Sequence, residues 1–574
     1  MNWNATQVLT QESLQEQTLL SVRYKGAWQD CLFLGLILFL SVVLYITKIG
    51  FYSDDWAYFS ILESTENSSL LENYRNLMGS PNLRSRPVQA FLQGLIYWLF
   101  GLQPLGHHIF NTSMVLLSMW LLYFILREMR QSRTMAVVIP LVFCLMPHYS
   151  TDRLWHSAFM VTLSMLLYFL SLYADLRFLL SAGVKSWVWK AVSVLSLAGS
   201  ALSYEIFMPL FFVNPVLVGY LAWHVSKDTA NAKSINKNWH FFYLLNLAAM
   251  VGVVLYKVST ATRMGTLGFA KQVEWFGHLI WKLAKISFSM FGVKLPGIVW
   301  TSANLYADKL MIGVSVIAGL LIFVYVYRSM KQSAEGKNNL FFACLTLIGL
   351  VLFVAGFGIF LVNTNAIITP TGISNRIFLA SAMGAAVVFV GVIGWVSSLL
   401  SSMQVYRYTF SSLVALLCAG SLFTSNVIAA FWVDSYRQQK QVVADIIEKF
   451  PQLPGKSTLL LDGICPYAGP AVVFESSWDL AGAIQIAYRD TTIHADIVTP
   501  NLQIEENGMV TLMYGGANRT FHGYSNQLFV YHIGRKSVHS LPDAKAAEAY
   551  FQTYNPDYDN NCPPAMEGMG AGIF

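Results

Sequence analysis

Two adjacent carboxylates, Asp54 and Asp55, directly follow a long apolar stretch and are flanked by aromatic residues in the order Phe-Tyr-Ser-Asp-Asp-Trp-Ala-Tyr. Ionisable groups at the edge of a membrane are costly to bury and often mark functional sites. A carboxylate in such a place can take a proton from a hydroxyl group, which is general-base chemistry. The alternative is that Asp54 caps the helix that follows it, a role for which Ser53 is equally suited.

Two arginines follow in the same predicted loop. Arg84 and Arg86 precede Pro87 at the start of a short apolar stretch. The planar guanidinium group matches the geometry of phosphate, so a pair of them near the bilayer surface suits a lipid phosphate. The alternative is that both side chains extend to the headgroups of ordinary lipids.

Three later turns on the same predicted side carry further polar residues: His148, Asp152, Arg153 and His156 in the first, Tyr204 and Glu205 in the second, and Asn375 and Arg376 in the third. Glu205 alone could cap the helix that follows it. Several separate turns that bring charge to one face, however, predict a polar cavity that opens on that side of the membrane.

The composition predicts the elements that must position these residues. Of the 574 residues, 55% are hydrophobic and only 12% are charged, whereas soluble proteins carry about 25% charged residues. Mean hydropathy is +0.49. These values exclude an ordinary soluble enzyme, a disordered chain and a fibre, and the dispersed net charge of +6 does not favour nucleic-acid binding. The sequence therefore predicts a polytopic α-helical membrane protein.

Apolar stretches long enough to span a bilayer indicate about eleven transmembrane helices. They are Cys31–Ile49, His107–Leu126, Thr134–Met146, Trp155–Leu176, Trp187–Ser203, Phe207–His224, Phe241–Tyr256, Leu310–Tyr327, Leu340–Val362, Ile377–Leu400 and Tyr408–Phe431. The stretch Val88–Phe100 is short for spanning and is interpreted as a re-entrant or interfacial helix. With this count, clusters of Lys and Arg fall in the loops on the side of the N-terminus, as the positive-inside rule requires.

The predicted domains follow from this topology. Residues 1–30 form a cytoplasmic segment, and residues 31–432 form the membrane domain with outer loops 50–107 and 257–309. Residues 433–574 have globular composition and strand-like runs, so we expect an α/β domain outside the membrane. This domain contains Cys465 and Cys562, for which an oxidising compartment favours a disulfide, the alternative being two unpaired thiols.

The order of these residues resembles the GT-C superfamily of membrane glycosyltransferases. The pair Asp54-Asp55 with Tyr58 three residues later matches the acidic motif after the first span. The Arg86-Pro87 step and the apolar helix after it are similar to the juxtamembrane helix of aminoarabinose transferases and protein O-mannosyltransferases. Asp152 takes the place of the acidic residue in the second outer loop. Ser203-Tyr204-Glu205 resembles a Ser-Lys-Glu motif with tyrosine in place of lysine.

The resemblance implies an inverting transferase that moves one sugar from a polyprenyl-phosphate donor to a cell-surface glycan, lipid or protein. Asp54 would be the general base, with Asp55 as its partner or as ligand of a divalent metal ion, and Asp152 and Glu205 would orient hydroxyl groups. Arg86 and Arg376 would stabilise the departing phosphate. The other polar residues of the outer turns are assigned to substrate binding: Tyr58, Arg84, His148, Arg153, His156, Tyr204 and Asn375. The implied location is a bacterial inner membrane, with the site facing the periplasm.

Three other functions compete with this interpretation. A transporter or flippase of lipid-linked substrates would need carboxylates at mid-membrane depth, whereas the acidic residues named above lie at predicted helix ends. A ligase that moves a whole glycan from a pyrophosphate lipid would share the outward site. A purely structural scaffold would not explain charges gathered on one face.

Overall fold

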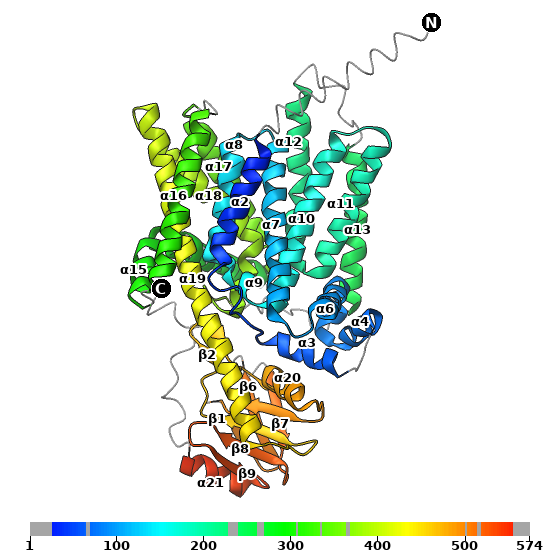
Figure 1. Ribbon diagram of the computed structural model, residues 1–574. Helices are drawn as coiled ribbons and strands as arrows, with labels where there is room; N and C mark the ends of the chain where they lie inside the picture. Colours follow the sequence, from blue (N-terminus) through cyan, green and yellow to red (C-terminus); the bar gives the residue numbers. More distant parts are fainter. Residues whose placement is uncertain are drawn as a thin grey trace.

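The structure is a computed structural model that describes residues 26–64, 69–227, 239–260, 269–305, 308–332, 336–362, 368–499, 502–513 and 518–554. A bundle of long, roughly parallel helices makes up most of it, and a smaller α/β unit projects from one end (Figure 1). We call this unit, residues 450–554, the cap domain, and the end of the bundle beside it the cap end.

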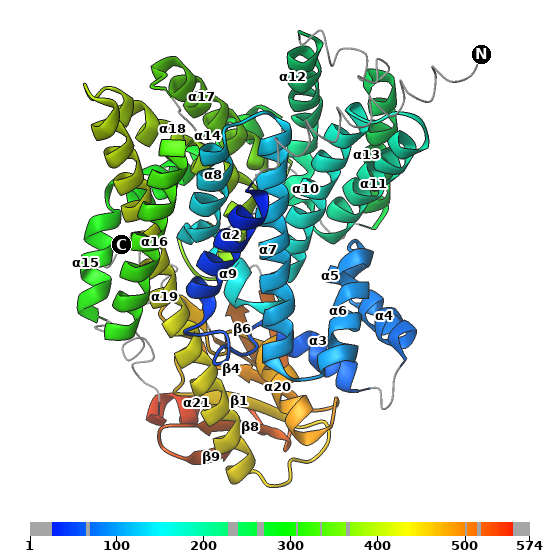
Figure 2. The same cartoon turned by 45° about the horizontal axis from the view of Figure 1, so that its top comes forward.

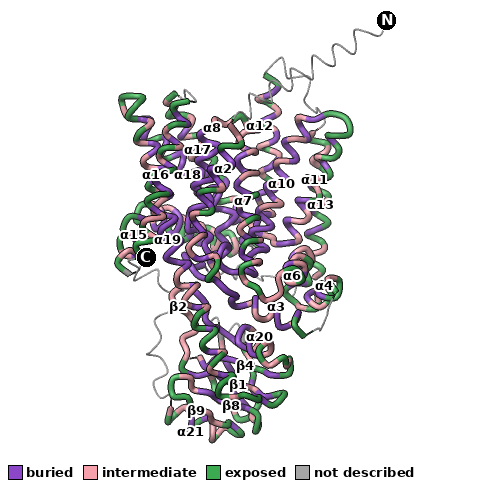
Figure 3. The backbone as a smooth tube through the Cα atoms, in the orientation of Figure 1, coloured by how far each residue is buried: buried purple, intermediate pink, exposed green. Residues whose placement is uncertain are grey.

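Eight helices of the described chain are long and apolar enough to cross a membrane. They are α7 (Pro104–Glu128), η2 with α10 (His156–Leu179), η3 with α12 (Glu205–Ser226), α13 (Trp239–Thr260), α16 (Lys309–Gln332), α17 (Asn339–Gly356), η7 with α18 (Ile373–Ser398) and α19 (Met403–Lys449). Their side chains form one continuous apolar core, and the buried positions gather on the inward faces (Figure 3). The protein is therefore an integral, multi-pass membrane protein.

Two further pairs of helices pass the same test but are bent at a break. The pair α8 (Arg133–Leu145) and η1–α9 (Pro147–Leu154) bends by 50°. The pair α14–η5 (Phe269–Val293) and α15 (Leu295–Leu305) bends by 68°. The second pair lies in the predicted outer loop 257–309, where no span was predicted, and it passes the length and composition test for a broken or re-entrant span.

All eleven predicted spans fall in helices, but two of these helices do not pass the test. The first, α2 (Ala27–Val42), has only 16 residues because turns follow it at residues 43–48. The other, α11 (Gly183–Ser203), has 21 residues that include two lysines and five serines, and it packs between α10 and α13. By length and composition, the described chain thus has eight to ten candidate spans.

Four short helices follow α2 in the chain and gather at the cap end, beside α7 on the side away from α2 (Figure 2). They are α3 (Asp54–Glu63), α4 (Leu70–Gly79), α5 (Pro81–Arg84) and α6 (Pro87–Phe100). Pro87 stands at the first position of α6, where its missing N–H has no partner to lose. At 14 residues, α6 is too short to span, which agrees with an interfacial or re-entrant helix.

The cap domain has a four-stranded sheet in the order β4-β1-β8-β9, in which β1 (Thr458–Asp462) lies parallel to β4 (His494–Ile497) and β8 (Leu528–His532). The fourth strand, β9 (Ser537–Ser540), is antiparallel to β8. The remaining strands form an antiparallel pair, β2 (Tyr467–Ala468) with β3 (Ala471–Val472), and an antiparallel meander, β5 (Gln503–Glu505), β6 (Gly508–Met513) and β7 (Asn518–Gly523). Two helices complete it, α20 (Ser477–Tyr488) and α21 (Ala544–Tyr554).

The long helix α19 joins the two parts of the molecule. It has 47 residues and leaves the bundle without a break, so the predicted span Tyr408–Phe431 and the first residues of the predicted outer domain, from residue 433, belong to one helix. Val442 and Ile446 of α19 belong to the apolar core of the cap domain. Within that domain Cys465 is disulfide-bonded. Its predicted partner, Cys562, lies outside the described residues, so the pairing stays a prediction.

Candidate active site

The loop that carries the two adjacent carboxylates is tightly held at the cap end of the bundle. The Tyr52 hydroxyl donates to the carbonyl of Trp432 at 2.6 Å, and the indole N–H of Trp155 donates to the carbonyl of Tyr52 at 2.8 Å. Asp55 is fully buried and accepts hydrogen bonds from the backbone N–H groups of Tyr52 at 2.9 Å and Ser157 at 2.7 Å, as well as from the Ser157 hydroxyl. Burial raises the pKa of Asp55 to about 7. Asp55 therefore anchors the start of α3 against η2 (His156–Ala158).

Asp54, its neighbour, is in a different situation. It starts α3, its side chain is partly exposed, and it has no hydrogen bond to any described residue. Burial raises the pKa of Asp54 above its usual value, while the positive charges of Arg376 and Arg86 act in the opposite direction. Tyr58 lies one turn further along α3, where residues four apart share a face. Asp54 is thus a partly buried carboxylate that feels the charges of Arg86 and Arg376 and has no hydrogen bond to a described residue.

A cluster of opposite charges lies beside Asp54 and joins three distant parts of the chain. Arg86 donates to Glu205 through Nη2 at 2.7 Å, and Lys257 donates to the other oxygen of Glu205 at 3.0 Å. The guanidinium of Arg86 also lies 4.4 Å from the centre of the Tyr204 ring. Two cations share one carboxylate, so the cluster keeps one positive charge at the cap end. The turns that carry Arg86 and Tyr204-Glu205 were expected on one face, and in the structure they are in contact.

Asp152 is the second carboxylate without a partner. It is 1% exposed, and neither carboxylate oxygen has a hydrogen bond to a described residue. Its backbone carbonyl accepts from Asn111 at 2.7 Å, which fixes the residue in α9. The charge of Arg376 acts on Asp152 as well as on Asp54, and the guanidinium lies 5.2 Å from the Trp155 ring centre. Arg376 thus links the two free carboxylates electrostatically.

Other residues predicted to bind substrate have structural contacts instead. Arg153 donates to the carbonyl of Cys144 at 2.7 Å and extends toward Tyr45, inside the bundle. Asn375 is fully buried and donates to the carbonyls of His148 and Pro370. Both side chains thus bond to backbone carbonyls of the same bent pair, Arg153 to Cys144 at the end of α8 and Asn375 to His148 in η1.

The two histidines and Arg84 have the contacts given below, and their role in substrate binding stays a prediction. The His148 ring lies among Phe291, Phe378 and Phe389, with a centre-to-centre distance of 5.1 Å to Phe291. His156 is buried and bonds His107, with its Nε2 3.0 Å from His107 Nδ1. Arg84 is exposed, and its backbone carbonyl accepts from Tyr256 at 2.9 Å.

Lys257 is a site residue that the sequence interpretation missed. It directly follows the predicted span Phe241–Tyr256 and was counted as the first residue of an outer loop. In the structure it lies near the end of α13 and binds Glu205. A cation at the cap end of a span was the available signal, because a charge at that depth needs a counter-charge.

The site gives limited support for a bound metal ion. The oxygens of Asp55 already accept three hydrogen bonds, so Asp55 does not fit the role of metal ligand. No group of three or more His, Cys, Asp or Glu side chains able to hold a metal was found within the described residues. Asp54 and Asp152 are the carboxylates with free oxygens.

The fold and site together define a polytopic helical membrane protein with a cluster of charged side chains at the end of the bundle beside an α/β cap domain. No known family profile and no curated protein sequence matches the chain. Among solved structures, it is similar to ArnT from Cupriavidus metallidurans bound to undecaprenyl phosphate. The identity is 16%, the match covers 83% of this chain and 87% of that one, and the TM-score is 0.35.

It is also similar to the Archaeoglobus fulgidus oligosaccharyltransferase tethered to an acceptor peptide. The identity is 12%, the match covers 81% of this chain and 64% of that one, and the TM-score is 0.38. Both structures belong to the superfamily that the sequence resembles. At such identities and TM-scores, the functional proposal below depends on the contacts of this chain's own residues.

Proposed function

We propose that this protein is a glycosyltransferase that moves a single sugar from a polyprenyl-phosphate donor to a hydroxyl group of a cell-surface acceptor at the cap end. The observation that carries the proposal is the state of Asp54. It is a partly buried carboxylate without a hydrogen-bond partner among the described residues, and it lies within the charge field of Arg86 and Arg376.

The proposed reaction uses this carboxylate as a base. The acceptor hydroxyl attacks the anomeric carbon of the donor sugar, a new C–O bond forms, and the bond between that carbon and the phosphate oxygen breaks. The hydroxyl proton passes to Asp54, and the bonding electron pair leaves with the lipid phosphate, so the configuration inverts. A raised pKa suits a base, because it makes the carboxylate a better proton acceptor.

The leaving phosphate gains negative charge as the bond breaks, and fixed cations stabilise that charge. Arg86, Lys257 and Arg376 are the cations close to Asp54 and Glu205. Glu205 holds Arg86 and Lys257 at 2.7 and 3.0 Å, which keeps two flexible side chains in one place before the donor arrives. Asp152 would accept hydrogen bonds from sugar hydroxyls, which would satisfy its two free oxygens.

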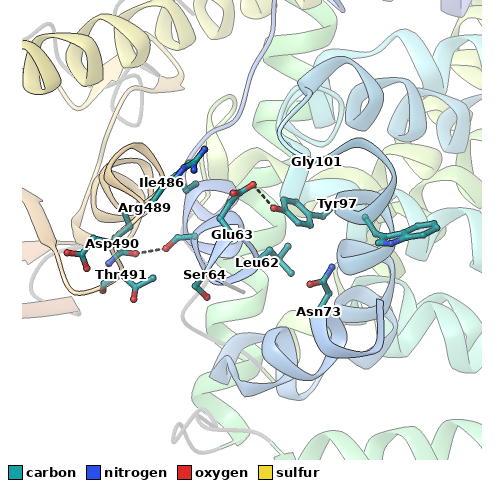
Figure 4. Close-up of a pocket in the computed structure, with 13 residues that line it drawn as sticks. Leu62, Glu63, Ser64, Asn73, Tyr97, Gly101, Ile486, Arg489, Asp490 and Thr491 are labelled. Atoms are coloured by element: carbon teal, nitrogen blue, oxygen red, sulfur yellow. Dashed lines mark hydrogen bonds between the residues drawn. The ribbon is translucent and has the colours of Figure 1, made fainter. Parts of the chain in front are cut away.

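A hollow of about 620 Å³ at the far end of α3 is the proposed approach for the acceptor. It lies around the last residues of α3, between α20 and the loop after it on one side and α4 and α6 on the other (Figure 4). Its charged residues are Glu63, Arg489 and Asp490, and Glu63 accepts a hydrogen bond from Tyr97 at 2.5 Å. One cation among two carboxylates favours a neutral, hydroxyl-rich molecule over a phosphate.

Two measurements test this function in the full chain reconstituted in lipid nanodiscs. Intact-mass analysis of the lipid that copurifies with the protein should show a polyprenyl phosphate. Transfer from a synthetic polyprenyl-phosphate sugar should fall by about 100- to 10,000-fold in Asp54→Asn, the range for loss of a general base, while donor binding remains. An Asp54→Asn variant with wild-type transfer would remove the proposed base.

A further inference from the structure

The cap domain reaches the residue immediately before Asp54. The Ser53 hydroxyl donates to one carboxylate oxygen of Glu475 at 2.7 Å, and the Tyr467 hydroxyl donates to the other at 2.7 Å. Glu475 lies between β3 and α20 and is 2% exposed. A buried carboxylate with a hydrogen bond to each oxygen is held in one orientation. Glu475 is thus a fixed point of the cap domain beside the proposed base.

Ser53 has a backbone conformation that serine rarely adopts. Its φ is 47° and its ψ is −120°, and φ in this left-handed range favours glycine. Such residues persist only where the surrounding structure over-determines them, and they cluster at active sites. The Ser53 side chain is 2% exposed, and Glu475 is the side chain that its hydroxyl binds. This hydrogen bond therefore helps to hold the backbone at the point from which α3 and Asp54 begin.

The rest of α3 lies directly on the cap domain. A Cβ atom on Gly482 of α20 would lie 2.5 Å from the carbonyl carbon of Trp56, so only glycine permits this approach. The Ser60 hydroxyl donates to Gln485 of α20, and the Trp56 indole donates to Gln439 of α19 at 3.4 Å. The helix that carries Asp54 thus has one face against the bundle, through Asp55 and Ser157, and one face against the cap domain.

We propose that Glu475 is a positioning residue, and that the cap domain uses it to fix Ser53 and thereby aim the Asp54 carboxylate. This inference rests on the proposed function, because it assigns the cap domain a role in the same reaction. Tyr52 and Ser53 each donate a hydrogen bond to another element and Asp55 accepts one, whereas Asp54 has no hydrogen bond to a described residue. That pattern fits a site in which the supporting residues are locked so that one reactive group is preorganised.

The test compares Glu475→Gln with Glu505→Gln, the same change at an exposed position of the cap domain. We expect Glu475→Gln to lower kcat for sugar transfer by about 10- to 100-fold, since small misplacements of a reacting group have effects of this size. The KM for the donor should stay within about twofold, because Glu475 does not touch the cation cluster. Glu505→Gln should behave as wild type. An unchanged kcat in Glu475→Gln overturns the proposal.

A double-mutant cycle with Ser53→Gly separates positioning from general stability. Glycine adopts positive φ without strain but lacks the hydroxyl, so Glu475→Gln should change kcat by less than about twofold in the Ser53→Gly background. Additive effects would contradict the proposed link. Should Glu475→Gln fail to fold, Tyr467→Phe removes the hydrogen bond to the other oxygen and should give a smaller loss of kcat with the donor KM unchanged.

Hydrogen exchange of the first amides of α3 gives a readout that does not depend on catalysis. Residues 54–58 should exchange faster in Glu475→Gln than in wild type, because the start of the helix loses its tether. Faster exchange with full transfer overturns the positioning role and leaves the proposed function intact. Wild-type transfer in Asp54→Asn instead overturns the proposed function, whatever the exchange data show.

Discussion

The two ends of the helix bundle differ in the pairing of their carboxylates, although Asp55 and Glu205 at the cap end are hydrogen-bonded like those at the far end. At the end far from the cap domain, Asp30 is fully buried and accepts hydrogen bonds from Arg133, Tyr123 and Tyr325. At the cap end, Asp54 and Asp152 have carboxylate oxygens without hydrogen bonds to any described residue. Both groups of carboxylates lie in apolar surroundings. They differ in whether their oxygens have hydrogen-bond partners among the described residues.

Two more pairs strengthen the contrast at the far end. Glu128 binds Arg177 at 2.8 Å, and Asp175 binds Lys190 at 2.9 Å and Asn246 at 2.8 Å. A buried carboxylate is costly unless it is paired and hydrogen-bonded. Proteins keep unsatisfied buried groups chiefly where function needs them. We therefore interpret the carboxylates at the far end as structural. At the cap end we expect a ligand to complete the hydrogen bonds of the carboxylates.

The largest expected effect tests the structural end. Lys190→Met leaves Asp175 buried without its cation, where both side chains are now 4% exposed. We expect the free energy of unfolding to fall by about 3 to 5 kcal/mol, the usual loss for breaking a buried ion pair, while transfer per folded molecule stays constant. Thermal unfolding in nanodiscs, followed by an activity assay of the folded fraction, measures both. A loss of transfer without a loss of stability would contradict the structural role assigned to the carboxylates at the far end.

Asp152→Asn should show the reverse behaviour at the cap end. The change removes an unpaired buried charge, so thermal stability should hold or rise. Sugar transfer should fall by about 100- to 1,000-fold, because fixed polar groups at a reacting centre contribute about that much. Transfer rates and unfolding midpoints of the same preparation check both parts. A variant that is unstable but fully active would place Asp152 with the structural carboxylates.

Arg86→Lys sharpens the role of the cation cluster. Lysine keeps the charge but not the planar fork that contacts both Glu205 and the Tyr204 ring. We expect transfer to fall by about tenfold, or about 1.4 kcal/mol, mainly through a higher KM for the donor. Lys257→Arg, which preserves a donor to Glu205, is the matched control and should stay within about threefold of wild type. An equal effect of the two variants would mean that charge alone matters.

The pH dependence gives the smallest expected change. Burial raises the pKa of Asp54 above its usual 3.8, and Arg376 and Arg86 lower it. The base must be ionised, so transfer should fall as the pH drops through this raised pKa. Replacing Arg376 with Gln removes one of the lowering charges and should move the acidic limb of the kcat/KM profile to higher pH. An acidic limb that stays at the wild-type pH would mean that the charge of Arg376 does not act on Asp54.

The sequence predicted the elements better than it predicted side-chain directions. Asp54, Arg86 and Glu205 were expected on one face, and the structure brings the last two together although 119 residues separate them. Asp152 and Arg153, in contrast, are neighbours with different surroundings: one has free oxygens, and the other donates to Cys144 inside the bundle. Successive residues on a helix differ in direction by about 100°, and only the packing of the helices decides which one faces a site.

Two other features had no clear signal in the sequence. The bend between η5 and α15 turns the expected outer loop into a pair of apolar helices, and the amphipathic pattern there fits a surface helix equally well. The contact between Ser53 and Glu475 joins residues 422 positions apart. Hydropathy and charge describe each of these segments separately, whereas their meeting depends on how the cap domain is seated on the bundle.

The unbroken course of α19 constrains how the cap domain can move relative to the helix bundle. Its 47 residues contain no proline, and at about 1.5 Å per residue they form a rod of about 70 Å, more than twice the hydrocarbon thickness of a bilayer. Such a helix has no break where it leaves the membrane. The cap domain above Asp54 therefore stays at a fixed height relative to the bundle. Under the proposed function, a lipid-linked sugar would have to reach Asp54 at that height, and the thickness of the surrounding bilayer would help to determine which part of the donor arrives there.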